Sequence, residues 1–252
     1  MDGTISPIVQ DPATATVRAD ARRWLQLLAG RLELVAALSG RSVADLVRMV
    51  DVPGMVYVGN HGLEWWEDGR TTVAPEAEPY LPVVESAVRE LSDRLQELPG
   101  ALVENKGASA AVHYRLSLDP EAARDAILEA IAGSPSAQRL RVADGRMVVN
   151  LLPPVRVDKG TAVERLVLLR KLLAVVYLGD DVTDLDAFRA VRSLRESGRA
   201  QGAAVAVASA ESPGDLLAEA DYVLEDIDAA VCLLRGMVSG EADCWCSAIL
   251  TP

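Results

Sequence analysis

The stretch that decides the fold reads AVVYLGDDVTDLDAF over residues 174–188. Its first half is an apolar run ending at Gly179, typical of a buried β-strand, and its second half has the apolar spacing of a helix. The loop between them carries Asp180, Asp181 and Asp184. Carboxylates crowded at the carboxyl end of a strand repel one another unless a cation lies among them, and such hard oxygen ligands suit Mg²⁺. The alternative is an ordinary helix start, where acidic residues are favoured by capping and by the helix dipole.

Strand-like and helical segments alternate on both sides of this stretch. The apolar, β-branched runs predict buried strands over 32–38, 55–58, 174–178, 203–208 and 222–224. Apolar residues at helical spacing predict helices over 16–28, 43–50, 162–172, 184–195 and 213–220. This βαβα order predicts an α/β fold in which helices cover both faces of a parallel sheet.

The middle of the chain has a different order. A helix is predicted over 82–97, strands over 101–106 and 110–116, a helix over 120–131, and strands over 140–143 and 146–152. Asp144-Gly145 is a tight-turn signal between the last two strands. Prolines 79, 82, 153 and 154 bracket this ββαββ unit. We therefore predict a core domain over 1–79 and 156–252 with a small α/β cap domain inserted at 80–155.

Composition narrows the class of partner and the compartment. The 252-residue chain is half apolar and carries a formal charge of −12, which argues against nucleic acid or an anionic membrane as a partner. Its apolar runs are far shorter than the roughly 20 residues of a membrane span. The three cysteines, Cys232, Cys244 and Cys246, form no disulfide framework by their spacing. We expect a cytoplasmic protein.

Three further short motifs also stand at the exits of predicted elements. Asp2-Gly3-Thr4 opens the chain, Ser39-Gly40-Arg41 follows the second predicted strand, and Asp158-Lys159-Gly160 opens the helix before the acidic loop. The carboxyl ends of parallel strands meet at one edge of a sheet, which is where α/β proteins bind ligands. All four motifs are therefore expected at one site.

This ordered set resembles the four motifs of haloacid dehalogenase phosphatases: an Asp-x-Asp-Gly-Thr loop, a Ser or Thr, a Lys, and a Gly-Asp-Asp-x-x-Asp loop. Gly59-Asn-His-Gly-Leu-Glu64 resembles a signature of the trehalose-6-phosphate phosphatases in that superfamily. The segments 103–106 and 113–115 are similar to that family as well. The resemblance implies a Rossmann-like parallel-sheet core with an inserted cap, and Mg²⁺-dependent hydrolysis of trehalose 6-phosphate.

The resemblance also implies roles for residues. An Asp nucleophile would form an aspartyl-phosphate, and Asp2 matches the second Asp of the motif, which acts as general acid and base and lends its backbone carbonyl to the metal. Asp180 is the expected carboxylate ligand, with Asp181 and Asp184 as second ligand or orienting groups. Ser39 would bond a phosphoryl oxygen and Lys159 would neutralise phosphate and nucleophile. The ordinary alternatives are a helix N-cap for Ser39 and a surface charge for Lys159.

Substrate contacts are expected from both predicted domains. The residues implied by the resemblance and by their place in the motifs are Thr4, Gly40, Arg41, Asn60, His61, Glu64, Glu104, Lys106 and Arg115. The alternative for the polar residues at 104–115 is the solvent-exposed face of an ordinary sheet, where polar residues also alternate. The alternative for His61, in a turn beside Gly62, is a structural role. The small-molecule partner is a sugar phosphate; whether the synthase that makes it is also a partner is not determined by the sequence.

The chain departs from the family pattern at two places. Met1 occupies the x position of Asp-x-Asp-Gly-Thr, so the nucleophile and the first strand would lie ahead of it. We expect Met1 to be an internal residue of that motif. A relative that binds sugar phosphate without hydrolysing it is the alternative. Asn150-Leu-Leu-Pro153 stands where the family tends to have Glu, then Arg-Pro, which leaves a phosphatase for another sugar phosphate open.

Overall fold

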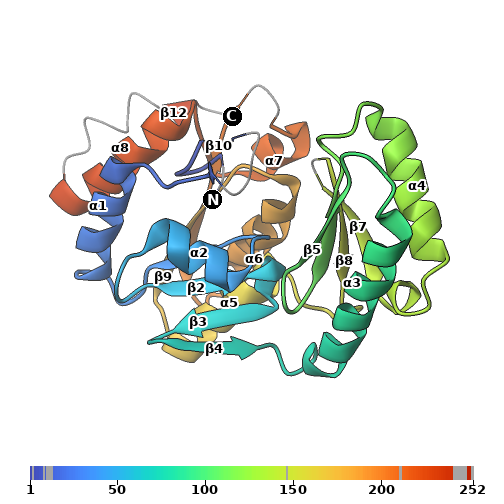
Figure 1. Cartoon of the computed structure of the whole chain (residues 1–252). Coiled ribbons are helices and arrows are strands. Elements are labelled where there is room, and N and C mark those ends of the chain that lie inside the picture. The colour runs from blue at the N-terminus through green and yellow to red at the C-terminus, as the bar shows by residue number, and fades with distance from the viewer. Residues whose placement is uncertain are drawn as a thin grey trace. The chain divides into compact units, whose positions relative to one another are not determined.

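The structure, a computed structural model, describes residues 1, 3–7, 9, 14–145, 147–209, 212–240 and 249–250. The chain divides into two compact units, the first formed by Met1–Thr71 with Val157–Pro252 and the second by Thr72–Arg156 (Figure 1). The sequence prediction placed these divisions at 79/80 and 155/156. Each unit is described by itself below.

The first unit contains two four-stranded sheets. One has the order β1-β2-β3-β4, with β1 (Ala36–Leu38), β2 (Val56–Gly59), β3 (Glu64–Glu67) and β4 (Arg70–Val73), the strand within which the division at 71/72 falls. The other has the order β12-β11-β10-β9, with β9 (Ala174–Gly179), β10 (Gln201–Val207), β11 (Tyr222–Leu224) and β12 (Ile249–Leu250). β1 with β2, β9 with β10 and β10 with β11 are parallel pairs, so the predicted α/β class with parallel strands is confirmed.

Helices pack on both sides of these strands. They are α1 (Ala19–Ala29), α2 (Val43–Val50), α5 (Lys159–Arg170), α6 (Leu185–Glu196), α7 (Gly214–Glu219) and α8 (Ile227–Ser239), with short 3-10 turns η2 (Asn60–Gly62) and η5 (Val182–Asp184). α5 and α8 each pack on both sheets: α5 through Ala162 and Leu166 on β2 and through Val163 and Val167 on the cluster of β9 and β10. α8 joins the clusters of β1 with β2 and of β10 with β11. Figure 1 shows α1 beside α8, and these two helices are in contact.

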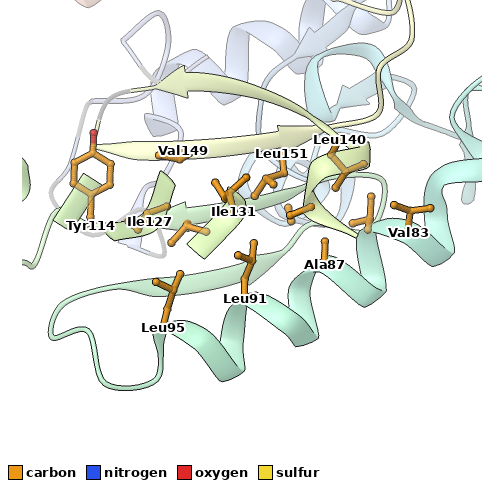
Figure 2. Close-up of a cluster of buried hydrophobic side chains, with 14 of the residues drawn as sticks. Val83, Ala87, Leu91, Leu95, Tyr114, Ile127, Ile131, Leu140, Val149 and Leu151 are labelled. Carbon is orange, nitrogen blue, oxygen red and sulfur yellow. The ribbon is translucent and has the colours of Figure 1, made fainter. Parts of the chain in front are cut away.

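The second unit is an antiparallel sheet with two helices. It contains η3 (Glu78–Tyr80), α3 (Leu81–Leu95), β5 (Leu102–Asn105), β6 (Ala110–His113), α4 (Pro120–Ala132), η4 (Ala137–Arg139), β7 (Arg141–Gly145) and β8 (Val148–Leu152), and the strand order is β5-β6-β8-β7. Val83, Ala87, Leu91 and Leu95 form one stripe of α3 and meet the strands, as Figure 2 shows. Strand residues alternate between the two faces, so only one face of the sheet joins this core.

Several elements differ from the sequence prediction. The strand expected over 32–38 is formed only at Ala36–Leu38, where it pairs with β2. The predicted turn at Asp144-Gly145 is wrong, because both residues pair in β7 and Gly145 lies opposite Val148. The β3–β4 hairpin was not predicted, although Asp68 and Gly69 have the positive φ angles of a tight hairpin turn, 48° and 78°. Helix α8 was not predicted either.

Two further observations concern the chain's chemistry. Cys232 on α8 is disulfide-bonded, which the spacing of the cysteines did not predict. None of the helices formed by the described residues has the length and apolar character needed to cross a membrane.

Candidate functional site

Asp184 is the centre of the acidic loop and is fully buried. Its Oδ1 accepts hydrogen bonds from Lys159 Nζ at 2.7 Å and from the Tyr177 hydroxyl at 2.6 Å. Its Oδ2 accepts the backbone N–H groups of Asp180 and Asp181, both at 3.1 Å. Four donors therefore satisfy one buried carboxylate. This arrangement fixes the loop on one side and the Lys159 ammonium on the other.

The electrostatics of this group follow from those contacts. Burial raises the pKa of Asp184, but the charge of Lys159 and the Met1 ammonium, together with the hydrogen bonds, outweigh it and lower the pKa to about 2. Burial and the neighbouring Asp184 carboxylate raise the pKa of Tyr177 well above its usual value. Asp184 is thus a permanent anion and Tyr177 a permanent donor across the ordinary pH range.

Asp180 lies beside the first described residues of the chain. The Thr4 hydroxyl donates to Asp180 Oδ1 at 2.6 Å, and the Met1 amino nitrogen lies 3.8 Å from the same oxygen. Burial is the largest influence on Asp180 and raises its pKa, against the opposing effects of the Met1 ammonium and the Thr4 hydroxyl. Both of these contacts are to Oδ1 of a partly buried carboxylate with a shifted pKa, which is a feature of candidate functional groups.

The Ser39 loop, residues 39–42, is joined to η2 by backbone hydrogen bonds. The His61 N–H donates to the Ser39 carbonyl at 3.0 Å, and the Asn60 N–H donates to the Arg41 carbonyl at 2.8 Å. A Cβ atom at Gly40 would lie 2.5 Å from His61 Nε2, so a larger residue there would displace that imidazole. The buried Ser39 hydroxyl accepts the Arg41 N–H at 3.2 Å.

The backbone of η2 is unusual. Asn60, His61 and Gly62 have consecutive positive φ angles of 49°, 59° and 111°. Non-glycine residues adopt this region at a cost, and such strain persists where surrounding contacts enforce it. Glu64 supplies one such contact, because its buried Oε2 accepts the Val43 N–H at 3.1 Å at the start of α2. The Glu64 carboxyl group thus lies at the N-terminus of α2, the positive end of the helix dipole, where acidic side chains are favoured.

The groups just described meet around the start of α5. η2 packs against α5, whose first residue is Lys159, and η5 packs against α5 as well. Asp158 caps the helix by accepting the Thr161 N–H at 2.8 Å. Lys159 is buried, so the surface-charge alternative is wrong. The Ser39 loop, η2, Lys159 and the acidic loop therefore lie together around the start of α5 in the first unit and make up the candidate site.

The second unit carries a separate polar cluster. Glu104 Oε2 lies 2.6 Å from His113 Nε2 and 3.9 Å from Lys106 Nζ. Strand register places Glu104 opposite Ala111, and Ala111 opposite Asn150, so these residues share the face of the sheet opposite the apolar core. Arg115 lies in the turn after β6. Of the expected sugar contacts, Glu104 and Lys106 are brought together.

Two residues complete the comparison with the sequence prediction. Asp2 lies outside the described residues. Tyr177 was missed as a site residue, since it was taken only as part of a buried strand. A buried Tyr hydroxyl needs a hydrogen-bond partner, so a Tyr two residues before Gly179-Asp180 was a usable signal.

The carboxylates of the acidic loop can be compared with the ligands that Mg²⁺ prefers. Among the described residues no group of three or more His, Cys, Asp or Glu side chains has the arrangement of a metal site. Asp180 and Asp181 nevertheless offer the one or two carboxylates that Mg²⁺ takes, the remaining ligands being water and phosphate. Asp184 already accepts two hydrogen bonds on each oxygen, which favours the orienting role over the ligand role.

The sheet order, the inserted unit and the four motifs define a haloacid dehalogenase fold, and solved structures share it. A trehalose-6-phosphate phosphatase related protein matches with a TM-score of 0.75 at 20% identity, over 94% of this chain and 94% of that one. The C-terminal domain of the Candida albicans trehalose-6-phosphate phosphatase matches with a TM-score of 0.74 at 23% identity, over 95% and 89%.

Sequence comparison gives the family. The trehalose-phosphatase family model matches residues 1–228, and the chain belongs to that family. A trehalose-phosphate phosphatase of Mycobacterium avium is 44% identical over 76% of this chain and 50% of its own length. One from Mycobacterium tuberculosis is 41% identical over 75% and 49%. The chain spans about half the length of the curated relatives it matches.

Proposed function

We propose that this chain provides the phosphatase activity that hydrolyses trehalose 6-phosphate to trehalose and phosphate. The observation that carries the proposal is the buried Lys159–Asp184 pair, 2.7 Å apart, beside Asp180 in a chain of the trehalose-phosphatase family. A buried cation held by one carboxylate and adjoining a second is suited to a phosphate dianion, because its charge is poorly screened there.

The proposed reaction has two steps. An aspartate directly ahead of Met1 attacks phosphorus, and the sugar oxygen leaves with a proton from Asp2. Water then attacks the aspartyl-phosphate and gives its proton to Asp2, which releases phosphate and restores the nucleophile. Ser39 and Lys159 bond the phosphoryl oxygens, and Tyr177 and Asp184 hold Lys159 in place.

Asp180 and Asp181, with the Asp2 carbonyl, are the proposed Mg²⁺ ligands. When bound, Mg²⁺ draws charge from the phosphoryl oxygens and screens the carboxylates from one another. Asp184 orients the loop through the N–H groups of Asp180 and Asp181, at 3.1 Å each.

Sugar recognition is proposed for both units. Glu104 and Lys106 offer hydrogen bonds to hydroxyls from the face of the second unit's sheet opposite its apolar core. The other proposed contacts are Thr4, Gly40, Arg41, Asn60, His61 and Arg115, with Glu64 acting through the start of α2. We propose the cytoplasm as the compartment.

Phosphate release from trehalose 6-phosphate, with Mg²⁺ and with chelator, tests the proposal. The chain as it stands is compared with one extended ahead of Met1 by an apolar strand ending in Asp. We expect release from the extended chain only, and a loss of about 100-fold or more in Lys159→Met. Lys171→Met, the same charge change at an exposed position, is the matched control.

Two outcomes would change the conclusion. Faster release from sucrose 6-phosphate or glucose 6-phosphate than from trehalose 6-phosphate would assign another sugar phosphate. Binding of trehalose 6-phosphate without release by either chain would assign a non-catalytic binding module.

A further inference from the structure

The turn η2 contacts both segments that carry the proposed phosphate-binding side chains, Ser39 and Lys159. On one side, the His61 N–H donates to the Ser39 carbonyl at 3.0 Å. On the other side, a Cβ atom at Gly62 would lie 2.7 Å from the carbonyl oxygen of Asp158, the residue directly before Lys159. The shape of η2 therefore sets the position of the Ser39 loop relative to the start of α5.

This turn needs support from outside itself. Asn60 and His61 have φ angles of 49° and 59°, although both carry a Cβ atom. The left-handed region is unfavourable for such residues, and a backbone in it persists only where the surrounding structure enforces it. A side chain that holds the end of η2 therefore also holds the Ser39 loop.

Trp65 on β3 makes such a contact. Its indole Nε1–H donates to the Gly62 carbonyl at 2.8 Å. Strand register places Trp65 opposite Val58, and the ring packs against the cluster of β2 and α5 that includes Ala162 and Leu166. A partly buried indole N–H needs a hydrogen-bond partner, so this bond fixes the orientation of the ring together with that of the carbonyl.

The helix α5 contacts the same indole through a charged residue. The guanidinium carbon of Arg165 lies 4.8 Å from the centroid of the Trp65 ring. A cation at this distance over the face of a Trp ring is attracted by it. Trp65 is therefore bonded to η2 and stacked on α5, the helix that begins with Lys159.

We propose that Trp65 is a positioning residue of the phosphate site. Through its bond to Gly62 it holds η2, and with η2 the Ser39 loop, against the helix that carries Lys159. The inference rests on the proposed function, because that function assigns Ser39 and Lys159 to the phosphoryl oxygens. Trp65 acts through the turn, and no contact between the indole and phosphate is required.

The neighbouring residue supplies a matched control. Side chains alternate along a strand, so Trp66 lies on the opposite face of β3 from Trp65. There it pairs with Tyr57, and the two ring centroids are 5.3 Å apart. Trp66→Phe thus makes the same chemical change as Trp65→Phe, one residue along the strand and away from α5.

The first readout is amide hydrogen exchange at Asn60 and His61, followed by NMR in the 252-residue chain. Trp65→Phe removes the indole N–H and keeps an aromatic ring for Arg165. We expect it to speed exchange at both amides by about tenfold, and Trp66→Phe to change exchange there by about twofold or less. Equal exchange in the two variants would overturn the proposal.

The second readout is the dissociation constant of inorganic phosphate, measured by titration calorimetry with Mg²⁺ present. We expect Trp65→Phe to weaken binding by about tenfold and Trp66→Phe to leave it unchanged. In a Ser39→Ala background, Trp65→Phe should weaken binding by about twofold or less, because a positioning residue loses its effect once the group that it positions is removed. A merely structural Trp65 would lower the affinity equally in both backgrounds, and that result would overturn the proposal.

Two further variants keep the outcomes separate. If Trp65→Phe does not fold, Arg165→Gln, at an exposed position of α5, should speed exchange at the same two amides by about threefold, and unchanged exchange would overturn the proposal. Phosphate binding as tight in Lys159→Met as in the wild type would refute the phosphate site of the proposed function, and this inference with it. Loss of binding in Lys159→Met with unchanged binding in Trp65→Phe would overturn the inference alone.

Discussion

At the scale of single residues, the buried Asp184 carboxylate organises the candidate site, and Tyr177 is the donor whose contribution can be isolated. Tyr177→Phe removes one hydrogen bond to Asp184 and keeps the ring, whose edge-on contact with Phe188 has a centroid distance of 6.0 Å. A hydrogen bond to a buried charge contributes about 1.5–3 kcal/mol. We expect urea denaturation to show a loss of that size in the free energy of unfolding. Tyr222→Phe, at an exposed position, is the control, and equal effects of the two variants would contradict the role of Tyr177.

The depressed pKa of Asp184 predicts acid sensitivity. The folded value of about 2 lies below the ordinary 3.8, so the stabilisation is fully present above about pH 4 and is lost as pH falls toward 2. Its size at neutral pH is about 2 kcal/mol. The raised pKa of Asp180 has the opposite effect on the pH dependence of stability. The contribution of Asp184 is therefore measured as the difference in unfolding free energy between the wild type and a variant. Unfolding free energies at pH 6, 4 and 3 should fall less steeply in Asp184→Asn than in the wild type. Asp215→Asn, an exposed carboxyl, should retain the wild-type slope; an unchanged slope in Asp184→Asn would exclude this linkage.

At the scale of elements, the junction of β2, η2 and α2 depends on a close backbone approach. A Cβ atom at Gly59 would lie 2.5 Å from the Val43 nitrogen and 2.9 Å from the Arg41 carbonyl oxygen. Backbone atoms cannot rotate away, so Gly59→Ala must displace the Ser39 loop, and we expect it to destabilise the first unit by about 1–3 kcal/mol. Gly214→Ala, where nothing lies within 4 Å of the added atom, is the matched control in thermal and urea unfolding. Equal stability of the two variants would show that the Ser39 loop shifts without a loss in the free energy of unfolding.

The elements predicted from sequence are those whose signal is local. The apolar run at 174–178 and the helix over 184–195 have clear periodicities, and the structure contains both. The turn at Asp144-Gly145 was misplaced because strand register is set by pairing with β8, and the chain reverses beyond Gly145, where Met147 has a φ of 57°. The Tyr177–Asp184 bond could not be read from spacing either, since it forms only when the loop after Gly179 folds back on its strand.

At the scale of the whole molecule, the chain leaves and re-enters the first unit only once, at 71/72 and 156/157. The second unit has its own apolar core, drawn from α3, α4 and the sheet, as Figure 2 shows. Four paired strands with two packed helices exceed what independent stability requires of a small α/β unit. The order of elements within it, ββαββ, could be predicted from the sequence because each strand run is short and bounded by turn residues.

This independence predicts that residues 72–156 fold alone. We expect the isolated segment to show a cooperative thermal transition by circular dichroism, because every residue of its buried cluster lies between Val83 and Leu151. Leu91→Ala removes a fully buried side chain of that cluster and should destabilise the segment by about 2–5 kcal/mol. Leu118→Ala, at a fully exposed position, deletes the same atoms and should leave the transition in place. A segment without a transition would mean that the second unit takes its stability from the first, and equal effects of the two alanines would mean that the Leu91 stripe is not its core.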